Sequence, residues 1–236
     1  MGSSGYISLS RQSGLMNEMR VIANNIANSA TAGYRQEGVV FSEFVQSIDQ
    51  GTSLSMSRGQ IRKTSFEQGT LTQTNGEFDF AIEGDGFFLL ETPLGERLTR
   101  AGSFAPNAAG DLVTHDGYRV LDAGGAPVFV PSGEGRISVA ADGTMSVGGQ
   151  PVGQLGVFVP TDPLSLKREN GVMFSANGTE PGENARMVQG FVENSNVNPI
   201  LQIARMVEVQ RAYELGQSFL DTENERIREA VKKLIR

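Results

Sequence analysis

The sequence has no cysteine and no tryptophan, and His115 is its only histidine. Without thiolates and with one imidazole, a zinc site would depend almost wholly on carboxylate ligands. A Ser-His-Asp triad would have to use His115, and no Gly-x-Ser-x-Gly elbow accompanies it. We therefore expect no catalytic residue, no metal and no cofactor, and we expect that the chain is not an enzyme.

Long apolar runs and clusters of basic residues are also missing. No 18-residue apolar stretch is present, and Met1–Arg20 lacks a basic start followed by an apolar core. We therefore expect neither membrane insertion nor a cleaved signal peptide. The net charge is −7, and residues 41–199 hold 10 basic and 19 acidic residues. This balance argues against a nucleic-acid ligand, because counterion release needs clustered lysine and arginine.

Glycine-containing turn signals recur about every 8–12 residues between Glu77 and Val192, which is typical of an all-β sandwich or barrel. The alternating segment Phe78–Glu83, a break at Gly84-Asp85-Gly86 and the apolar run Phe87–Leu90 predict a β-hairpin. Further turns are expected at Pro93–Gly95, Asn107–Asp111, His115–Gly117, Gly124–Pro127, Ala141–Gly143 and Gly148–Gly149. Short strands such as Arg136–Val139, Thr144–Val147 and Leu155–Val159 fit between them.

The last stretch of the chain predicts one long helix. Five apolar or aromatic residues fall seven apart there, which places them on one slowly supercoiling stripe. They are Met206, Tyr213, Leu220, Ile227 and Leu234. Asn198 can cap the first-turn N–H groups, and Pro199 suits the first helical position. A helix from Pro199 to the end has about 38 residues and is roughly 57 Å long. Its stripe needs a partner that is distant in sequence or is another molecule.

A second apolar stripe lies near the N-terminus, between about Ser10 and Asn28. Its members are Leu15, Met19, Ile22 and Ile26. Two narrow-striped helices at opposite ends of the chain predict an antiparallel coiled-coil hairpin, so we expect an α+β fold with a central all-β domain. A helix packed on its own domain is the alternative. The polar residues Asn24, Asn25 and Asn28 favour a turn, and Gly33 can take the left-handed conformation that ends a helix.

Residues 36–76 read as a connector. Glycine, serine, threonine and glutamine mix there with isolated apolar residues. Phe41, Phe44, Val45 and Ile48 are compatible with one or two helical turns, and Gly51–Ser57 reads as a polar loop. A bland flexible linker is equally consistent with this composition.

Three motifs, in this order along the chain, resemble the signature of bacterial flagellar rod and hook proteins. They are Ala23–Tyr34 followed by Phe41, then Gly69–Thr74 with Asp79–Phe88, then Glu193–Pro199 with Gln210–Glu214. The resemblance implies residues 1–35 as the N-terminal helix of a core coiled coil, 36–76 as an extended arm, 77–192 as an outer β-rich domain and 193–236 as the C-terminal helix. Because the motifs span the chain, the resemblance covers essentially all of it.

The residues expected to carry assembly combine the two stripes with the polar segments beside them. They are Leu15, Met19, Ile22, Ile26, Asn24, Asn25, Asn28, Gly33, Tyr34, Asn196, Asn198, Met206, Tyr213, Leu220, Ile227 and Leu234. The family implies a structural subunit of the basal-body rod that crosses the periplasm. It also implies export by the flagellar type III apparatus and contacts with copies of itself and with other rod proteins.

Within the family, the length and the motif Asp79–Phe88 resemble a proximal rod protein, and a distal rod or hook subunit is the alternative. Two interpretations come from other classes. An envelope glycan hydrolase would use the carboxylates among Glu77, Asp79, Glu83 and Asp85, although their alternation with apolar residues favours a solvated strand face. A β-rich adhesin-like module on a coiled-coil stalk would need continuous heptads in one segment, whereas here the stripes lie at the two ends.

Overall fold

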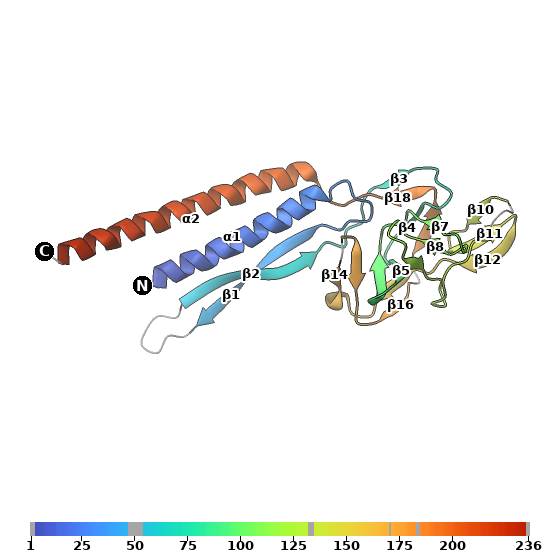
Figure 1. Cartoon of the computed structure of the whole chain (residues 1–236), viewed down its shortest axis with the longest axis horizontal. Coiled ribbons are helices and arrows are strands. Elements are labelled where there is room, and N and C mark those ends of the chain that lie inside the picture. The colour runs from blue at the N-terminus through green and yellow to red at the C-terminus, as the bar shows by residue number, and fades with distance from the viewer. Residues whose placement is uncertain (1–2, 47–53, 132–134, 170, 183–184, 235–236) are drawn as a thin grey trace. The chain divides into compact units, whose positions relative to one another are not determined.

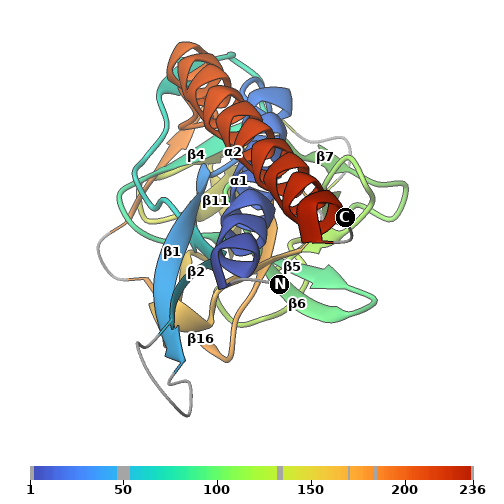
Figure 2. The same ribbon diagram turned by 90° about the vertical axis from the view of Figure 1, so that its left-hand side faces the viewer.

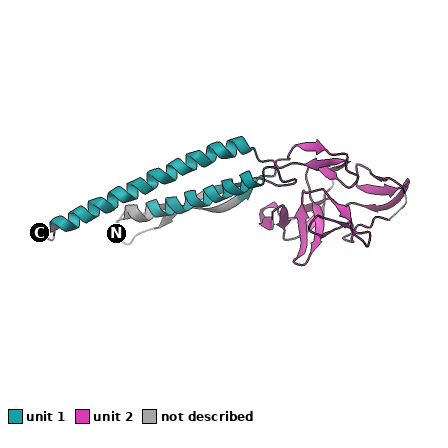
Figure 3. Cartoon of the chain, turned by 45° about the horizontal axis from the view of Figure 1, so that its top comes forward, with its two compact units in different colours: residues 1–29, 36–66, 197–236 teal, residues 30–35, 67–196 magenta. Residues whose placement is uncertain are grey.

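The computed structural model describes residues 3–46, 54–131, 135–169, 171–182 and 185–234, with side chains described except at 3–7, 41–46, 54–62 and 234. The chain forms two compact units, coloured separately in Figure 3. Unit 1 contains residues 1–29, 36–66 and 197–236, and unit 2 contains residues 30–35 and 67–196. The class is α+β, with a helix near each end of the chain and a β-rich region between them, as expected.

Unit 1 consists of two helices and a β-hairpin. Helix α1 (Ser3–Ala27) lies between the long helix α2 (Pro199–Leu234) and the antiparallel strands β1 (Glu37–Gln46) and β2 (Leu54–Thr64), as Figures 1 and 2 show. Among the described residues, no helix is both long and apolar enough to span a membrane.

The start of α2 is where the sequence places it. The side-chain oxygen of Asn198 accepts hydrogen bonds from the backbone N–H groups of Ile200 (3.1 Å) and Leu201 (3.2 Å), and Pro199 is the first helical residue. The cap satisfies two donors that have no carbonyl partner in the first turn. The helix continues to Leu234, the last described residue.

The N-terminal helix differs from its expected bounds at both ends. It begins at Ser3, earlier than Ser10, and ends at Ala27, six residues before Gly33. Gly33 does adopt a positive φ of 71°. It therefore does not terminate α1, and its conformation serves a close backbone approach within unit 2, described below.

The helical turns considered for residues 41–48 are wrong over the described part. Residues 41–46 continue β1, which pairs with β2 from Glu37↔Thr64 to Gln46↔Leu54 and has a bulge between Val40 and Phe41. Ile48 and residues 51–53 of the expected polar loop lie outside the described residues, and residues 54–57 belong to β2, so the loop prediction is wrong there. The β-branched and aromatic content of the segment is also that of a strand, and pairing with the following strand β2 favours the strand over the helix.

All named strand pairs of unit 2 are antiparallel. The largest sheet has the order β14 (Lys167–Glu169), β15 (Met173–Ser175), β6 (Gly95–Thr99), β5 (Phe88–Thr92), β9 (Arg119–Val120), β8 (Leu112–Val113) and β7 (Ala105–Pro106). A second sheet has the order β10 (Ile137–Val139), β11 (Thr144–Val147) and β12 (Gln150–Gln154). The remaining pairs are β3 (Leu71–Gln73) with β18 (Phe191–Glu193), β4 (Phe80–Glu83) with β17 (Arg186–Gln189), and β13 (Phe158–Pro160) with β16 (Thr179–Pro181). One short 3₁₀ helix, η1, spans Pro163–Ser165.

Strand β5 explains why the run Phe87–Leu90 is continuously apolar. Phe88 and Leu90 belong to one buried cluster, and Phe87 and Leu89 belong to another. Successive residues of a strand point to opposite faces, so β5 is buried on both sides. The rings of Phe88 and Phe104 meet edge to face at 5.2 Å in the first cluster.

The predicted hairpin at Gly84-Asp85-Gly86 is wrong, although the chain does turn there. Strand β4 pairs with β17, from Arg186↔Glu83 to Gln189↔Phe80, and β5 pairs with β6 and β9. The glycines let the chain pass from one sheet to another, with Gly86 at a φ of 130°. Sequential strands are neighbours only about two-thirds of the time, so a turn signal alone does not fix the pairing.

Candidate assembly surface

The stripe predicted on α2 is partly buried over most of its length. Met206, Tyr213 and Leu220 are half-buried, and Val209, which lies between the first two, is only 2% exposed. On α1, Ile22 is buried, and the other three members of the predicted stripe are half-buried. The stripe ends before the helix does: Ile227 is 50% exposed, and the side chain of Leu234 is outside the described ones.

The two helices also meet through three polar pairs, which we call the polar rungs. Gln12 donates to the side-chain oxygen of Gln217 (3.1 Å). Arg205 forms an ion pair with Glu18 (2.7 Å), and the hydrogen bond to Glu18 raises the pKa of Arg205. The third rung joins Asn25 to Gln202, as described next. The partner number on α2 falls as the number on α1 rises, so the helices run antiparallel.

Asn25 is the only one of the three predicted elbow asparagines that is buried, with 1% of its surface exposed. Its amide nitrogen donates to the Glu37 carbonyl (2.7 Å) and to the side-chain oxygen of Gln202 (3.2 Å), and its oxygen accepts from the Glu37 N–H (3.0 Å). Asn25 therefore joins α1, α2 and the first residue of β1. Asn24 is exposed, and its carbonyl accepts from the half-buried Asn28 (2.8 Å), which closes the end of α1.

Unit 1 leaves much apolar surface uncovered. A groove of about 440 Å³ lies along the two helices, and Leu15, Ala212, Leu215 and Phe219 are among its lining residues. Leu215 is 73% exposed and Phe219 is 49% exposed. Exposed apolar side chains also occur at other turns of α2, namely Ile200, Leu201, Ile203 and Val207. The exposed apolar side chains that line the groove make it a candidate interaction surface.

Helix α2 extends beyond α1. The Gln12–Gln217 pair leaves nine residues of α1 before it and seventeen residues of α2 after it, so α2 overhangs by about eight residues, or roughly 12 Å. Ile227 and Val231 lie on this overhang, and each is about half exposed. The exposure of Ile227 follows from this difference in helix length.

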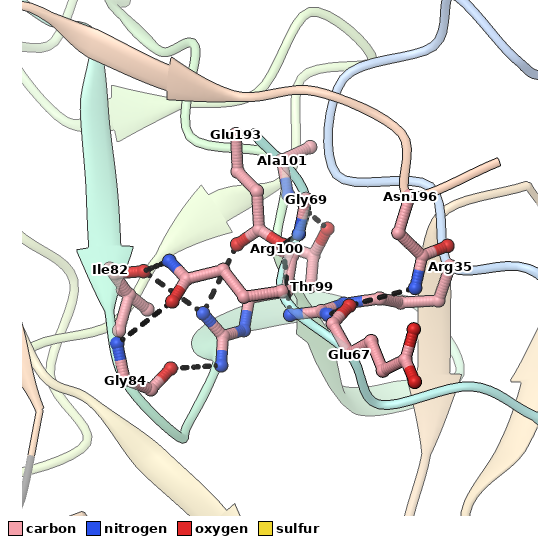
Figure 4. Close-up of polar contacts among 11 residues, drawn as sticks. Arg35, Glu67, Gly69, Ile82, Gly84, Thr99, Arg100, Ala101, Glu193 and Asn196 are labelled. Atoms are coloured by element: carbon pink, nitrogen blue, oxygen red, sulfur yellow. Dashed lines mark hydrogen bonds and ion pairs between the residues drawn. The ribbon is translucent and has the colours of Figure 1, made fainter. Parts of the chain in front are cut away.

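Three sequence motifs meet in unit 2 around a buried carboxylate. Glu193 is paired with Arg35 (2.9 Å) and with Arg100 (3.1 Å), and all three side chains are at most 3% exposed (Figure 4). The backbone N–H of Gly69 also donates a hydrogen bond to the carboxylate of Glu193 (3.0 Å). We call Arg35, Arg100 and Glu193 the buried clasp. It joins the segment that follows the N-terminal elbow, the residue after β6 and the end of β18.

Arg100 also satisfies backbone carbonyls between β4 and β5. Its guanidinium donates to Ile82 (3.1 Å) and Gly84 (2.6 Å), which are the carbonyls on either side of Glu83. Burial lowers the pKa of Arg100 to about 10, and the charge of Glu193 acts in the opposite direction, so the group remains protonated at pH 7. The clasp is therefore a charged network with one carboxylate and two guanidiniums.

The elbow residues Gly33 and Tyr34 belong to the same network of unit 2. The N–H of Gly33 donates to the Glu193 carbonyl (2.7 Å), and a side chain at this position would meet the Ala101 nitrogen at 2.2 Å. Tyr34 is 1% exposed. The guanidinium carbon of Arg168 lies 4.3 Å from the centre of the Tyr34 ring. Asn196 donates from its side chain to the Glu67 carbonyl (2.7 Å). Hence Gly33, Tyr34 and Asn196 hold unit 2 together, whereas the other predicted residues lie in unit 1.

The acidic residues weighed for glycan hydrolysis do not converge on a pocket. Glu77 accepts from the Ile137 N–H (2.9 Å), and Asp79 accepts from the Thr74 hydroxyl (2.6 Å), so both anchor loops. Glu83 and Asp85 are exposed. Across the described ranges, no group of three histidine, cysteine, aspartate or glutamate residues is placed to hold a metal ion.

Sequence reasoning missed both the rungs and the clasp. Glu193 stands inside a motif quoted above and Arg35 directly follows another, but neither carried an assigned role, and Arg100 lies outside the motifs. The only signal for the rungs is a set of polar residues next to apolar stripes, which by itself does not separate a buried polar pair from a solvated face.

Comparison with known proteins agrees with the motifs. Three family models match: "Flagella basal body rod protein" over residues 6–35, "Flagellar hook protein FlgE/F/G D1 domain" over 81–147 and "Flagellar basal body rod FlgEFG protein C-terminal" over 188–232. The basal-body rod protein FlgF of Mesorhizobium japonicum is 37% identical over 99% of this chain and 98% of its own length. FlgF of Caulobacter vibrioides gives the same identity and coverage.

A relative of another type is also similar. The basal-body rod protein FlgG of Bacillus subtilis is 31% identical over 96% of this chain and 97% of its own length. Identity at these levels over nearly complete chains confirms the resemblance seen in the motifs. The chain therefore belongs to the family of bacterial flagellar basal-body rod proteins.

Proposed function

We propose that this chain is a structural subunit of the flagellar basal-body rod, in its proximal part, and that it assembles through α1 and α2. The observation that carries the proposal is the apolar surface of α2: among the described side chains, Leu215 is 73% exposed and Phe219 is 49% exposed. Relatives named FlgF support the proximal position. A distal position is the alternative that the FlgG relatives suggest.

In this proposal α1 and α2 pair as an antiparallel coiled-coil hairpin, and their remaining apolar side chains are buried against identical or related rod subunits. Each such side chain contributes about 1.5–3 kcal/mol when fully buried. Contacts that join different surfaces of successive subunits do not close on themselves and give a helical tube. We also propose export through the flagellar type III apparatus and a final location in the rod as it crosses the periplasm.

Replacing Leu215 with aspartate is expected to reduce incorporation into basal bodies at least about tenfold, because the loss of one buried leucine already exceeds 1.4 kcal/mol. Since Leu215 is mostly exposed within one chain, folding of unit 2 should be unchanged. The measurement is an immunoblot of purified basal bodies together with swimming motility. Gln210→Asp, which adds the same charge at an exposed polar position of α2, is the matched control. Normal incorporation of the Leu215 variant would contradict the proposal.

Limited proteolysis of the free chain is expected to trim the two ends before unit 2. Among the described side chains, only four buried hydrophobic residues lie in unit 1: Val21, Ile22, Val197 and Val209. This small core has to offset an ordering cost of about 1–2 kcal/mol per residue. We therefore expect residues 67–196 to survive as the resistant fragment, identified by mass spectrometry, and the ends to be protected in basal bodies. A free chain that resists cleavage throughout would oppose this expectation.

A further inference from the structure

Beside its apolar residues, the interface between α1 and α2 contains three buried polar side chains from α1. The α1 members of the three rungs, Gln12, Glu18 and Asn25, are 9%, 8% and 1% exposed. They are spaced along the helix at six and seven residues, so a rung occurs about every two turns. Each has its partner on α2 within 3.2 Å. The rungs therefore extend along α1 from Gln12 to Asn25.

Apolar side chains alone do not fix the register of one helix against the other. Their attraction has no direction, so a stripe repeating every seven residues can slide by one repeat and bury similar surface. A buried polar group cannot slide in this way, because leaving it without a partner costs about 1–3 kcal/mol. The chemistry of the rungs also differs: amide with amide, carboxylate with guanidinium, and an asparagine that also binds the Glu37 backbone. Only one register satisfies all three together.

We propose that the polar rungs are specificity determinants of assembly, selecting the α2 of the same chain, in one register, over the α2 of a neighbouring subunit. The inference rests on the proposed function, because only a packed assembly supplies competing copies of α2. Gln12, Glu18 and Asn25 are positioning residues in this account. Leu215 and Phe219, outside the rungs, remain available to neighbours.

The test uses the natural absence of cysteine. Leu15→Cys with Ala212→Cys reports the native register, because Leu15 lies midway between Gln12 and Glu18, and Ala212 lies between their partners Gln217 and Arg205. Leu15→Cys with Phe219→Cys reports a slip of one repeat, since Phe219 is about 10 Å farther along α2. A disulfide forms only when the Cα atoms lie within about 7 Å. Each pair is expressed in the full chain, oxidised in purified basal bodies and analysed by non-reducing electrophoresis and peptide mass spectrometry.

The pairs are placed in the native chain and in a rung-free chain. The rung-free chain carries Gln12→Leu with Gln217→Leu, Glu18→Met with Arg205→Met, and Gln202→Met, so that none of the three rungs remains and no buried charge is left alone. Asn25 is kept, because it also bonds the Glu37 backbone. The control chain carries Glu91→Met with Arg119→Met, an ion pair of unit 2 that is about half exposed on both sides. Exchange between chains is measured by co-expressing a Leu15→Cys chain with an Ala212→Cys chain.

With the rungs intact, and in the control, the native pair should cross-link at least about tenfold more than the slipped pair, and co-expressed chains should give no disulfide dimer. In the rung-free chain the native and slipped cysteine pairs should cross-link to comparable extents. Disulfide dimers of the co-expressed chains should also appear. A rung-free chain that keeps both the register and the intrachain pairing would overturn the inference. Absence of the native chain from basal bodies would instead contradict the proposed function, so the two failures are distinguishable.

Discussion

Replacing Glu193 with alanine is expected to lower the free energy of unfolding of unit 2 by about 3–5 kcal/mol, because two buried guanidiniums would lose the carboxylate with which both are paired. Arg35 and Arg100 both pair with this carboxylate, at 2.9 and 3.1 Å, and the Gly69 N–H would lose its acceptor as well. The measurement is urea unfolding of the full chain, followed by hydrogen exchange of β4, β5 and β18. Glu193→Gln, which keeps an acceptor oxygen and removes the charge, should give a smaller loss.

Two comparisons isolate the buried clasp as the cause. Glu91→Ala breaks an ion pair whose side chains are 48% and 49% exposed, and such surface pairs contribute only about 0–1 kcal/mol. The triple variant Arg35→Met, Arg100→Met and Glu193→Leu removes every charge of the clasp and should recover part of the loss, since uncompensated buried charge is the main penalty. Equal losses for Glu193→Ala and Glu91→Ala would contradict the role given to the clasp.

Gly33→Ala is expected to destabilise unit 2 by about 2–5 kcal/mol, from two additive causes. A positive φ of 71° costs a residue with a side chain about 1–2 kcal/mol, and overpacking costs about 1–3 kcal/mol. The overpacking arises because the new Cβ would meet the Ala101 nitrogen at 2.2 Å, where backbone atoms cannot give way cheaply. Thermal unfolding and hydrogen exchange at Gly33 and Glu193 would measure the effect.

Gly117→Ala is the matched control for this substitution. Gly117 has a similar φ of 84°, but nothing lies within 4 Å of an added Cβ. Its variant should therefore show only the backbone cost of about 1–2 kcal/mol. If the two variants lose the same stability, the close approach of the elbow to Ala101 contributes nothing and the description of Gly33 is wrong.

The features that the sequence predicts well are those decided by residues close together in the chain. The start of α2 follows from Asn198 and Pro199, and the stripe on its face follows from the spacing of Met206, Tyr213 and Leu220. Most turns of unit 2 also lie where glycine supplies a positive φ, as at Gly95, Gly117 and Gly143. In each case the deciding contact spans a few residues, so local chemistry is sufficient.

The features that the sequence does not predict depend on long-range pairing. Strand β4 pairs with β17, more than a hundred residues later, and no local signal distinguishes this from a hairpin with β5. The clasp joins Arg35, Arg100 and Glu193, and each of these is an ordinary charged residue in its own segment. Their burial is what makes their pairing important for stability, and burial depends on how the sheets pack. The rungs were missed for the same reason, since polar residues beside a stripe usually face water.

The most direct test of the central claim is electron cryomicroscopy of basal bodies from cells whose chain carries a small folded insertion at the Gly124-Gly125 turn. This turn is exposed, and an added Cβ at Gly125 meets nothing within 4 Å, so the insertion should leave unit 2 intact. The account predicts extra density on the proximal part of the rod, in subunits whose α1 and α2 line the tube. Density on the distal rod or hook would keep the structural role and contradict the proximal position. Basal bodies without extra density, with the protein found elsewhere in the envelope, would contradict the account as a whole.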